Sequence, residues 1–411
     1  MANLKERYLG PAVRVALTDT PAVLIVGPRQ AGKTTLCRMV GAPDARSFIT
    51  FDDANVLASA KADPQGFVAL LPRHVVLDEI QRVPELLLAL KLEIDTARQP
   101  GRFLMTGSAN VLALPRIADS LAGRMEVITL WPLSQGEIEG TPERFLARIF
   151  GDDFRAEVVV GDGRESLIDR ALVGGYAEVL ARNAGRRDAW FASYLTTILQ
   201  RDVRDISNIE GLTDLPRILR FLASRAGKVL NVADAGRALG VPHTTLTRYL
   251  SLLENTFLIR KIPAWAGDTG RRLTKAPRIV LTDTGLVAHL DGITADSLAG
   301  DFTRAGGLLE NLAAMELIKQ SGWSATRANL YHYRSHAGQE VDFVLEAADG
   351  RLVGIEVKAR TTVSDSDFGG LRSFRDVVGR RFHRGMVLYG GSATLPFGDQ
   401  MTAAPISALW S

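Results

Sequence analysis

One stretch near the N-terminus limits the folds open to this chain more than any other. Residues 23–26 are the branched apolar run VLIV, which predicts a buried strand. Residues 27–34 then match the pattern G-x-x-x-x-G-K-[ST], and an apolar helix start follows. Glycines let backbone N–H groups surround an anion, and the helix adds its positive dipole end. This order of elements predicts a loop that binds the phosphates of a nucleotide.

The loop predicts ATP and Mg²⁺ as ligands. The Lys33 ammonium would bind the β- and γ-phosphates, and the Thr34 hydroxyl would hold Mg²⁺. The residues expected to contact the nucleotide are Gly27, Pro28, Arg29, Gln30, Ala31, Gly32, Lys33, Thr34 and Thr35.

A second apolar run ends in acids that such a loop needs. Residues 74–79 predict a strand that terminates in Asp78 and Glu79, about one strand–helix unit after the loop. An Asp at this place orders Mg²⁺, and the adjoining Glu can polarise the attacking water. We therefore expect Asp78 at the metal and Glu79 as the catalytic base.

Three further residues are candidates with an alternative open for each. The strand predicted at 103–110 ends in small polar residues, of which Ser108 or Asn110 would hydrogen-bond the γ-phosphate, or else cap a turn or helix. Arg124 precedes a strand at 125–130. It is a candidate arginine finger, acting in its own chain or in a neighbouring subunit, or else a solvated surface arginine.

Together these residues resemble the AAA-type ATPases. More narrowly, they resemble a bacterial and archaeal group whose Walker B segment is similar to LDEIQRVPELL and whose sensor strand contains TGS. Here those letters stand at residues 77–87 and 106–108. The resemblance covers nearly the whole chain, because that group carries a companion C-terminal domain.

The middle of the chain predicts a helix-turn-helix. Residues 219–224, 231–240 and 241–254 are three helical segments with a turn at Gly240, and strands at 257–261 and 278–282 would form a wing. This resembles a winged-helix domain, which is either a DNA-binding domain or a lid and packing module. On DNA, the residues near bases would be His243, Thr244, Thr245 and Arg248. The residues near phosphates would be Arg271, Arg272, Lys275 and Arg278.

The C-terminal part places three acids and a lysine where a metal site would need them. Strand alternation puts Asp342 on one strand and Glu356 with Lys358 on one face of its neighbour, and Glu310 lies on a preceding helix. Carboxylates bind Mg²⁺, and the lysine favours a hydroxide nucleophile. The pattern resembles the restriction-endonuclease-like fold. The alternative is an inherited fold whose acids are paired with Lys358 and Arg334.

The predicted architecture is therefore α/β with several domains. The expected boundaries are a P-loop AAA-type parallel-sheet domain at 1–148, a helical linker at 149–214, a winged-helix domain at 215–300 and a restriction-endonuclease-like domain at 301–411. The predicted function is Mg²⁺-dependent ATP hydrolysis on or near DNA, by a homo-oligomer. The alternatives are an ATP-gated winged-helix transcriptional regulator and an ATP-controlled metal-dependent nuclease.

Composition limits the partners and the cellular compartment that we expect. The net charge of +3 is too small to indicate nucleic acid without local clustering. No run is long and apolar enough to cross a bilayer and the start lacks a signal-peptide core, so we expect a cytoplasmic protein with no membrane partner. The single cysteine, Cys37, excludes an internal disulfide framework and is expected to be a buried structural thiol.

Overall fold

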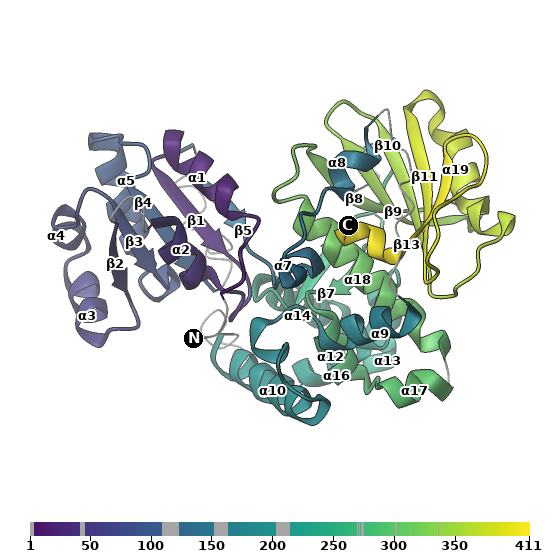
Figure 1. Cartoon of the computed structure of the whole chain (residues 1–411). Helices are drawn as coiled ribbons and strands as arrows, with labels where there is room; N and C mark the ends of the chain where they lie inside the picture. The colour runs from purple at the N-terminus through teal and green to yellow at the C-terminus, as the bar shows by residue number, and fades with distance from the viewer. Residues whose placement is uncertain are drawn as a thin grey trace. The chain divides into compact units, whose positions relative to one another are not determined.

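The computed structural model divides the chain into two compact units. The N-terminal unit is Met1–Leu133 with Asn255–Leu258, and the C-terminal unit is Ser134–Glu254 with Ile259–Ser411 (Figure 1). The domain boundaries predicted at 148, 214 and 300 stay predictions. The structure describes residues 4–41, 46–108, 123–151, 163–202, 214–268, 270, 272, 275–300, 302–335 and 337–411.

A five-stranded parallel sheet forms the centre of the N-terminal unit (Figure 1). Its strands, in the order β2-β3-β4-β1-β5, are β2 (Ser47–Thr50), β3 (Val75–Asp78), β4 (Phe103–Gly107), β1 (Ala22–Val26) and β5 (Met125–Thr129). Every residue of β1, β3 and β4 is buried, as expected for parallel strands covered on both faces. The helices of this unit are α1 (Gly10–Asp19), α2 (Lys33–Gly41), α3 (Ala54–Ala62), α4 (Pro64–Ala69) and α5 (Leu86–Thr96).

The parallel arrangement decides which residues meet. Strands that run the same way bring their carboxyl ends to one edge of the sheet. The phosphate loop follows β1, Glu79 follows β3 and Ser108 follows β4, so all three lie at that edge. The thiol of Cys37 on α2 is buried, as predicted, and burial raises its pKa well above the ordinary value.

The C-terminal unit combines helices with a mixed six-stranded sheet (Figure 1). The sheet order is β12 (Leu395–Pro396), β13 (Met401–Pro405), β11 (Phe382–Tyr389), β10 (Leu352–Lys358), β9 (Glu340–Ala347) and β8 (Ala328–Arg334). The helices that precede the sheet in sequence are α7 (Gln135–Glu139), α8 (Phe145–Ile149), α9 (Arg164–Val173), α10 (Ala184–Thr197), α12 (Leu215–Ala223), α13 (Val232–Leu239), α14 (His243–Asn255), α16 (Thr284–Asp291), α17 (Ala295–Gly300) and α18 (Ala305–Gln320). Helix α19 (Gly369–Val378) lies between β10 and β11 in sequence.

The three helices predicted in the middle of the chain are present as α12, α13 and α14. Asn231 caps α13 by accepting from two backbone N–H groups, and Gly240 ends that helix in the left-handed region. The two predicted strands form the antiparallel pair β6 (Ile259–Ile262) and β7 (Arg278–Leu281). Strand β6 begins two residues later than predicted, because Phe257 has a φ of +57° and is not extended.

Buried acids surround the start of α7 in the C-terminal unit. The Gly136 N–H donates to Glu143 at 2.6 Å, and the Gln135 N–H donates to Glu316 at 3.1 Å. These are N–H groups that a helix start leaves without intrahelical partners. Lys319 donates to Glu316 at 2.8 Å. Burial and the charge of Glu316 raise the pKa of Glu143 to about 9.

This shift gives a pH dependence of stability. Because the folded pKa of Glu143 exceeds its ordinary value of 4.5, the folded chain keeps a proton that the unfolded chain releases. The resulting stabilisation is complete below about pH 4.5 and is lost as the pH rises toward about 9. We expect the melting temperature of Glu143→Gln to fall less than that of the wild type over this range. Glu165→Gln, at an exposed position of α9, is the control. Parallel pH profiles for Glu143→Gln and the wild type would contradict the assignment.

Candidate nucleotide site

The loop after β1 has a backbone that suits glycine. Gly27 and Gly32 have φ values of +149° and +92°. A Cβ atom on Gly27 would lie 2.1 Å from the Leu130 carbonyl oxygen, so a larger residue would force the backbone apart. The buried Lys33 ammonium donates to the carbonyls of Gly27 and Pro28 at 2.9 and 2.8 Å. A positive charge therefore lies against the loop that is predicted to bind phosphate.

Asp78 contacts residues from several elements of the N-terminal unit. Its carboxylate accepts hydrogen bonds from the hydroxyls of Thr34 at 2.8 Å, Thr106 at 2.7 Å and Thr50 at 3.3 Å. Asp78 is only 5% exposed, and these donors satisfy a carboxylate that would otherwise be costly to bury. Thr50 belongs to no motif, whereas Thr106 is the first residue of the TGS segment. Both approach Asp78 because β2 and β4 flank β3.

Glu79 is held in an uncommon backbone conformation. Its φ of +62° and ψ of +45° lie in the left-handed region, which is unusual for a residue other than glycine and marks local strain. The Glu79 N–H donates to the Thr106 hydroxyl at 3.0 Å. The Glu79 carboxylate accepts from Gln81 and from the Ser108 hydroxyl, the latter at 3.3 Å. Ser108 therefore contacts Glu79, and its predicted contact with the γ-phosphate stays a prediction. Asn110 lies outside the described residues.

The oxygen atoms present suit Mg²⁺. The Thr34 hydroxyl and the Asp78 carboxylate are 2.8 Å apart, and both are ligand types that Mg²⁺ prefers. In the described ranges no group of three or more His, Cys, Asp or Glu side chains is placed to hold a metal. Mg²⁺ sites in nucleotide-binding proteins rely instead on one or two carboxylates with phosphate oxygens.

Arg124 lies at the amino ends of the strands, opposite the end that carries the phosphate loop. It precedes β5, whose first residue, Met125, pairs with Ala22 at the start of β1. Its guanidinium pairs with the Asp95 carboxylate at 2.5 and 3.1 Å. Strand β1 has five residues, so about 16 Å separates the amino ends of the strands from their carboxyl ends. A finger role in its own chain does not fit this position, and a role in a neighbouring subunit stays a prediction.

Arg7 contacts the loop although no sequence motif indicates it. Its guanidinium donates to the Ala31 carbonyl at 2.6 Å and to the Trp131 carbonyl at 2.7 Å. Arg7 is only 8% exposed. It therefore joins the phosphate loop to the segment that follows β5.

The C-terminal acids come together, but with a different cation from the one predicted. Arg278 on β7 is 3% exposed and pairs with Glu310 at 2.9 Å and with Asp342 at 3.0 Å. Lys358 pairs with Glu356 at 2.9 Å, as the strand alternation suggested. Burial, and after it the Asp342 charge, raises the pKa of both Glu310 and Glu356 to about 8.

Three arginine assignments need correction. Arg334 does not pair with these acids, because it pairs with Glu340 at 3.0 Å. Arg278 cannot meet DNA phosphates from its buried strand, in which every residue is buried. The Arg272 guanidinium is held by Glu346 at 2.6 and 3.2 Å. Arg271 lies outside the described residues.

The predicted base readers lie along α14 with unequal exposure. His243, Thr244 and Arg248 are exposed, and Thr245 is half-buried. The buried side of the helix carries Leu246, Tyr249, Leu250, Leu252 and Leu253.

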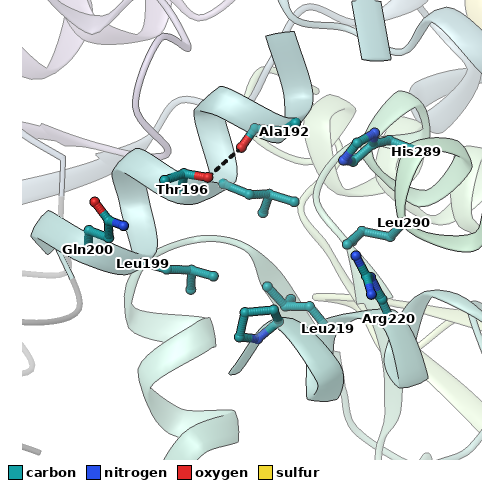
Figure 2. A pocket seen from close by; sticks show the side chains of 10 residues that line it. Ala192, Thr196, Leu199, Gln200, Leu219, Arg220, His289 and Leu290 are labelled. Atoms are coloured by element: carbon teal, nitrogen blue, oxygen red, sulfur yellow. Dashed lines mark hydrogen bonds between the residues drawn. The ribbon is translucent and has the colours of Figure 1, made fainter. Parts of the chain in front are cut away.

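A pocket of about 480 Å³ lies in the C-terminal unit among α10, α12 and α16 (Figure 2). Leucines supply much of its lining, and the Thr196 hydroxyl is already bonded to the Ala192 carbonyl at 2.8 Å. His289 is held by Asp188 at 2.5 Å. None of the predicted site residues is among the described residues that line this pocket.

Comparison with known proteins fits this site. Residues 19–139 match the family described as AAA domain, residues 164–297 match a domain of unknown function (DUF8612), and residues 305–409 match another (DUF4143). Uncharacterized proteins of Mycobacterium tuberculosis and Mycobacterium bovis are each 32% identical to the chain, over 98% of its length and 84% of theirs. The chain belongs to their family. It is a family of AAA-type P-loop ATPases with a C-terminal DUF4143 domain.

Other similarities are more distant. An uncharacterized protein of Haemophilus influenzae is 24% identical over 88% of the chain and 89% of its own length. A Walker-type ATPase of Pyrococcus abyssi is 15% identical with a TM-score of 0.44, covering 70% of this chain and 96% of that one. The RuvB Holliday junction branch migration motor of Thermotoga maritima gives 16% identity and a TM-score of 0.28, covering 71% and 90%. TM-scores this low carry no argument about activity. Among the described residues, no helix is long and apolar enough to cross a membrane.

The Arg278 ion pairs predict a structural role. Arg278→Met leaves the acids Glu310 and Asp342 buried without their cation, and we expect the C-terminal unit to lose about 3–5 kcal/mol in a denaturant titration. Adding Glu310→Gln and Asp342→Asn should restore part of that loss, while the exposed Arg248→Met should cost little. Unchanged stability of Arg278→Met, together with stabilisation of the wild type by Mn²⁺, would favour a metal site instead.

Proposed function

We propose that the protein binds ATP with Mg²⁺ in its N-terminal unit and hydrolyses it with Glu79 as the base. The observation that carries this is the 2.8 Å hydrogen bond between Thr34 of the phosphate loop and Asp78, the residue before Glu79. This contact brings the phosphate-binding and water-activating parts of the predicted site to one edge of the sheet. Family membership supports the nucleotide, since the matched AAA domain spans both parts.

Each residue has a separate task in this proposal. Lys33 and the loop N–H groups bind the β- and γ-phosphates. Thr34 and Asp78 would hold Mg²⁺, which neutralises charge on the phosphate oxygens when bound. Glu79 accepts a proton from the water that attacks the γ-phosphorus, while the bond between that phosphorus and the leaving oxygen of ADP breaks. Ser108 and Gln81 orient the Glu79 carboxylate by the hydrogen bonds that they donate.

Two substitutions separate binding from hydrolysis. Lys33→Ala removes the charge at the β/γ-phosphates, so we expect ATP binding to be lost in calorimetry. Glu79→Gln removes only the proton acceptor, so ATP binding should persist while the turnover number falls about 10²–10⁴-fold. Lys61→Ala and Glu85→Gln make the same chemical changes at exposed positions of the N-terminal unit and should behave as wild type. Wild-type turnover by Glu79→Gln would remove Glu79 from the mechanism.

A second proposal is that α14 contacts DNA. Its exposed side carries His243, Thr244 and Arg248, while its leucines are buried. These polar residues lie in the first half of the helix, the part that a recognition helix presents to base edges. ATP hydrolysis would then power a process on the bound DNA, or ATP binding would switch the protein as a DNA-bound transcriptional regulator. Metal-dependent cleavage is not proposed, because Arg278 already pairs with two of the three acids.

DNA contact has a distinct salt signature. Duplex binding measured by fluorescence anisotropy should weaken steeply with salt, at about 0.9 in the log–log slope per phosphate contact. Arg248→Ala should reduce discrimination between sequences by about 1–3 kcal/mol if Arg248 reads a base. Arg186→Ala, at an exposed position of α10, is the control. No binding of wild type at low salt would leave α14 as a packing element.

A further inference from the structure

The Arg7 guanidinium fixes one peptide unit of the phosphate loop. It donates to the Ala31 carbonyl at 2.6 Å. That carbonyl and the Gly32 N–H belong to one planar trans peptide, in which the two groups point in opposite directions. Holding the carbonyl therefore also sets the direction of the Gly32 N–H. A Cβ atom on Gly32 would lie 3.5 Å from the Arg7 guanidinium, so the two residues are closely packed.

The same guanidinium reaches a second element. Its other terminal nitrogen donates to the Trp131 carbonyl at 2.7 Å. The Trp131 ring packs edge-to-face against Phe257, with ring centroids 5.8 Å apart and an interplanar angle of 77°. Asn255–Leu258 belong to the N-terminal unit, although the chain on either side of them belongs to the C-terminal unit. Helix α14 ends at Asn255, two residues before Phe257.

Phe257 is held in a conformation that a bulky residue rarely adopts. Its φ is +57°, and the residue is only 7% exposed. Such strain persists only where neighbouring contacts impose it, and it is common at elements that switch between two arrangements. A change at Trp131 would therefore act on a strained turn that is continuous with α14.

We infer that Arg7 is a positioning residue that couples ATP binding at the phosphate loop to α14, through Trp131 and Phe257. This rests on the proposed ATP binding. Nucleotide phosphates that bind the Gly32 N–H reorient the peptide whose carbonyl Arg7 holds, and Arg7 passes the change to the Trp131 carbonyl. The Trp131 ring then shifts against Phe257, so the turn at the end of α14 responds to the nucleotide. The coupling is reciprocal, and a ligand on α14 alters ATP affinity by the same factor.

Hydrogen exchange of the full chain tests this coupling. The parent is Glu79→Gln, so that ATP is not consumed, and exchange is compared with and without saturating Mg²⁺-ATP. In the parent, ATP should slow exchange in peptides that cover residues 27–34 and in peptides that cover 243–262. Adding Arg7→Lys keeps the charge but loses the planar fork that spans two carbonyls. ATP should then still protect 27–34, while its effect on 243–262 falls by more than half.

Two further variants locate the path. Phe257→Leu keeps apolar bulk but removes the ring contact, so the ATP response of residues 243–262 should fall. Its ATP affinity should stay within about twofold of the parent, which is less than a typical coupling factor between two sites. Arg14→Lys makes the same change as Arg7→Lys at an exposed position of α1 and should leave both responses intact.

The outcomes separate this inference from the function on which it rests. No protection of 27–34 in the parent would overturn ATP binding and the coupling together. Protection of 27–34 without any response at 243–262 would overturn the coupling alone. A full response at 243–262 in either Arg7→Lys or Phe257→Leu would also overturn it.

Discussion

The buried carboxylate of Asp78 is the contact on which the proposed site depends. Three threonine hydroxyls, from the phosphate loop, β2 and β4, donate to it. This is possible only because β2, β3 and β4 are parallel neighbours whose carboxyl ends coincide. The same alignment places Thr106 where it also accepts the Glu79 N–H and helps to hold that residue in its strained conformation. In the proposed function, ATP binding and water activation would therefore depend on one set of hydrogen bonds.

The C-terminal unit uses its buried charges differently. Arg278 lies between Glu310 and Asp342, and Lys358 pairs with Glu356, so each of the three acids has a cation beside it. Breaking such a pair is costly because it leaves a buried charge without compensation. These contacts join β7 to α18 and β9. The packing of the unit therefore accounts for the cluster.

Local chemistry could be predicted from the sequence, whereas the partners across the fold could not. The phosphate loop is one continuous segment and the Asp78–Glu79 pair is another, so the residue types of each reveal it directly. The α13 caps Asn231 and Gly240 are local for the same reason. By contrast, Arg278 and Asp342 are 64 residues apart, and Arg7 and Trp131 are 124 residues apart. Such pairs depend on which strands become neighbours, and apolar periodicity does not encode that.

The Mg²⁺ dependence of ATP binding tests the central claim most directly. In Glu79→Gln protein, calorimetry with excess Mg²⁺ and with EDTA gives the contribution of the metal to affinity. If Thr34 and Asp78 hold the ion together, Mg²⁺ strengthens binding by about tenfold or more in the parent. Thr34→Val and Asp78→Asn each lose most of that gain, the double variant loses little more, and Thr34→Ser retains it. An undiminished effect of Mg²⁺ in both Thr34→Val and Asp78→Asn would contradict the account.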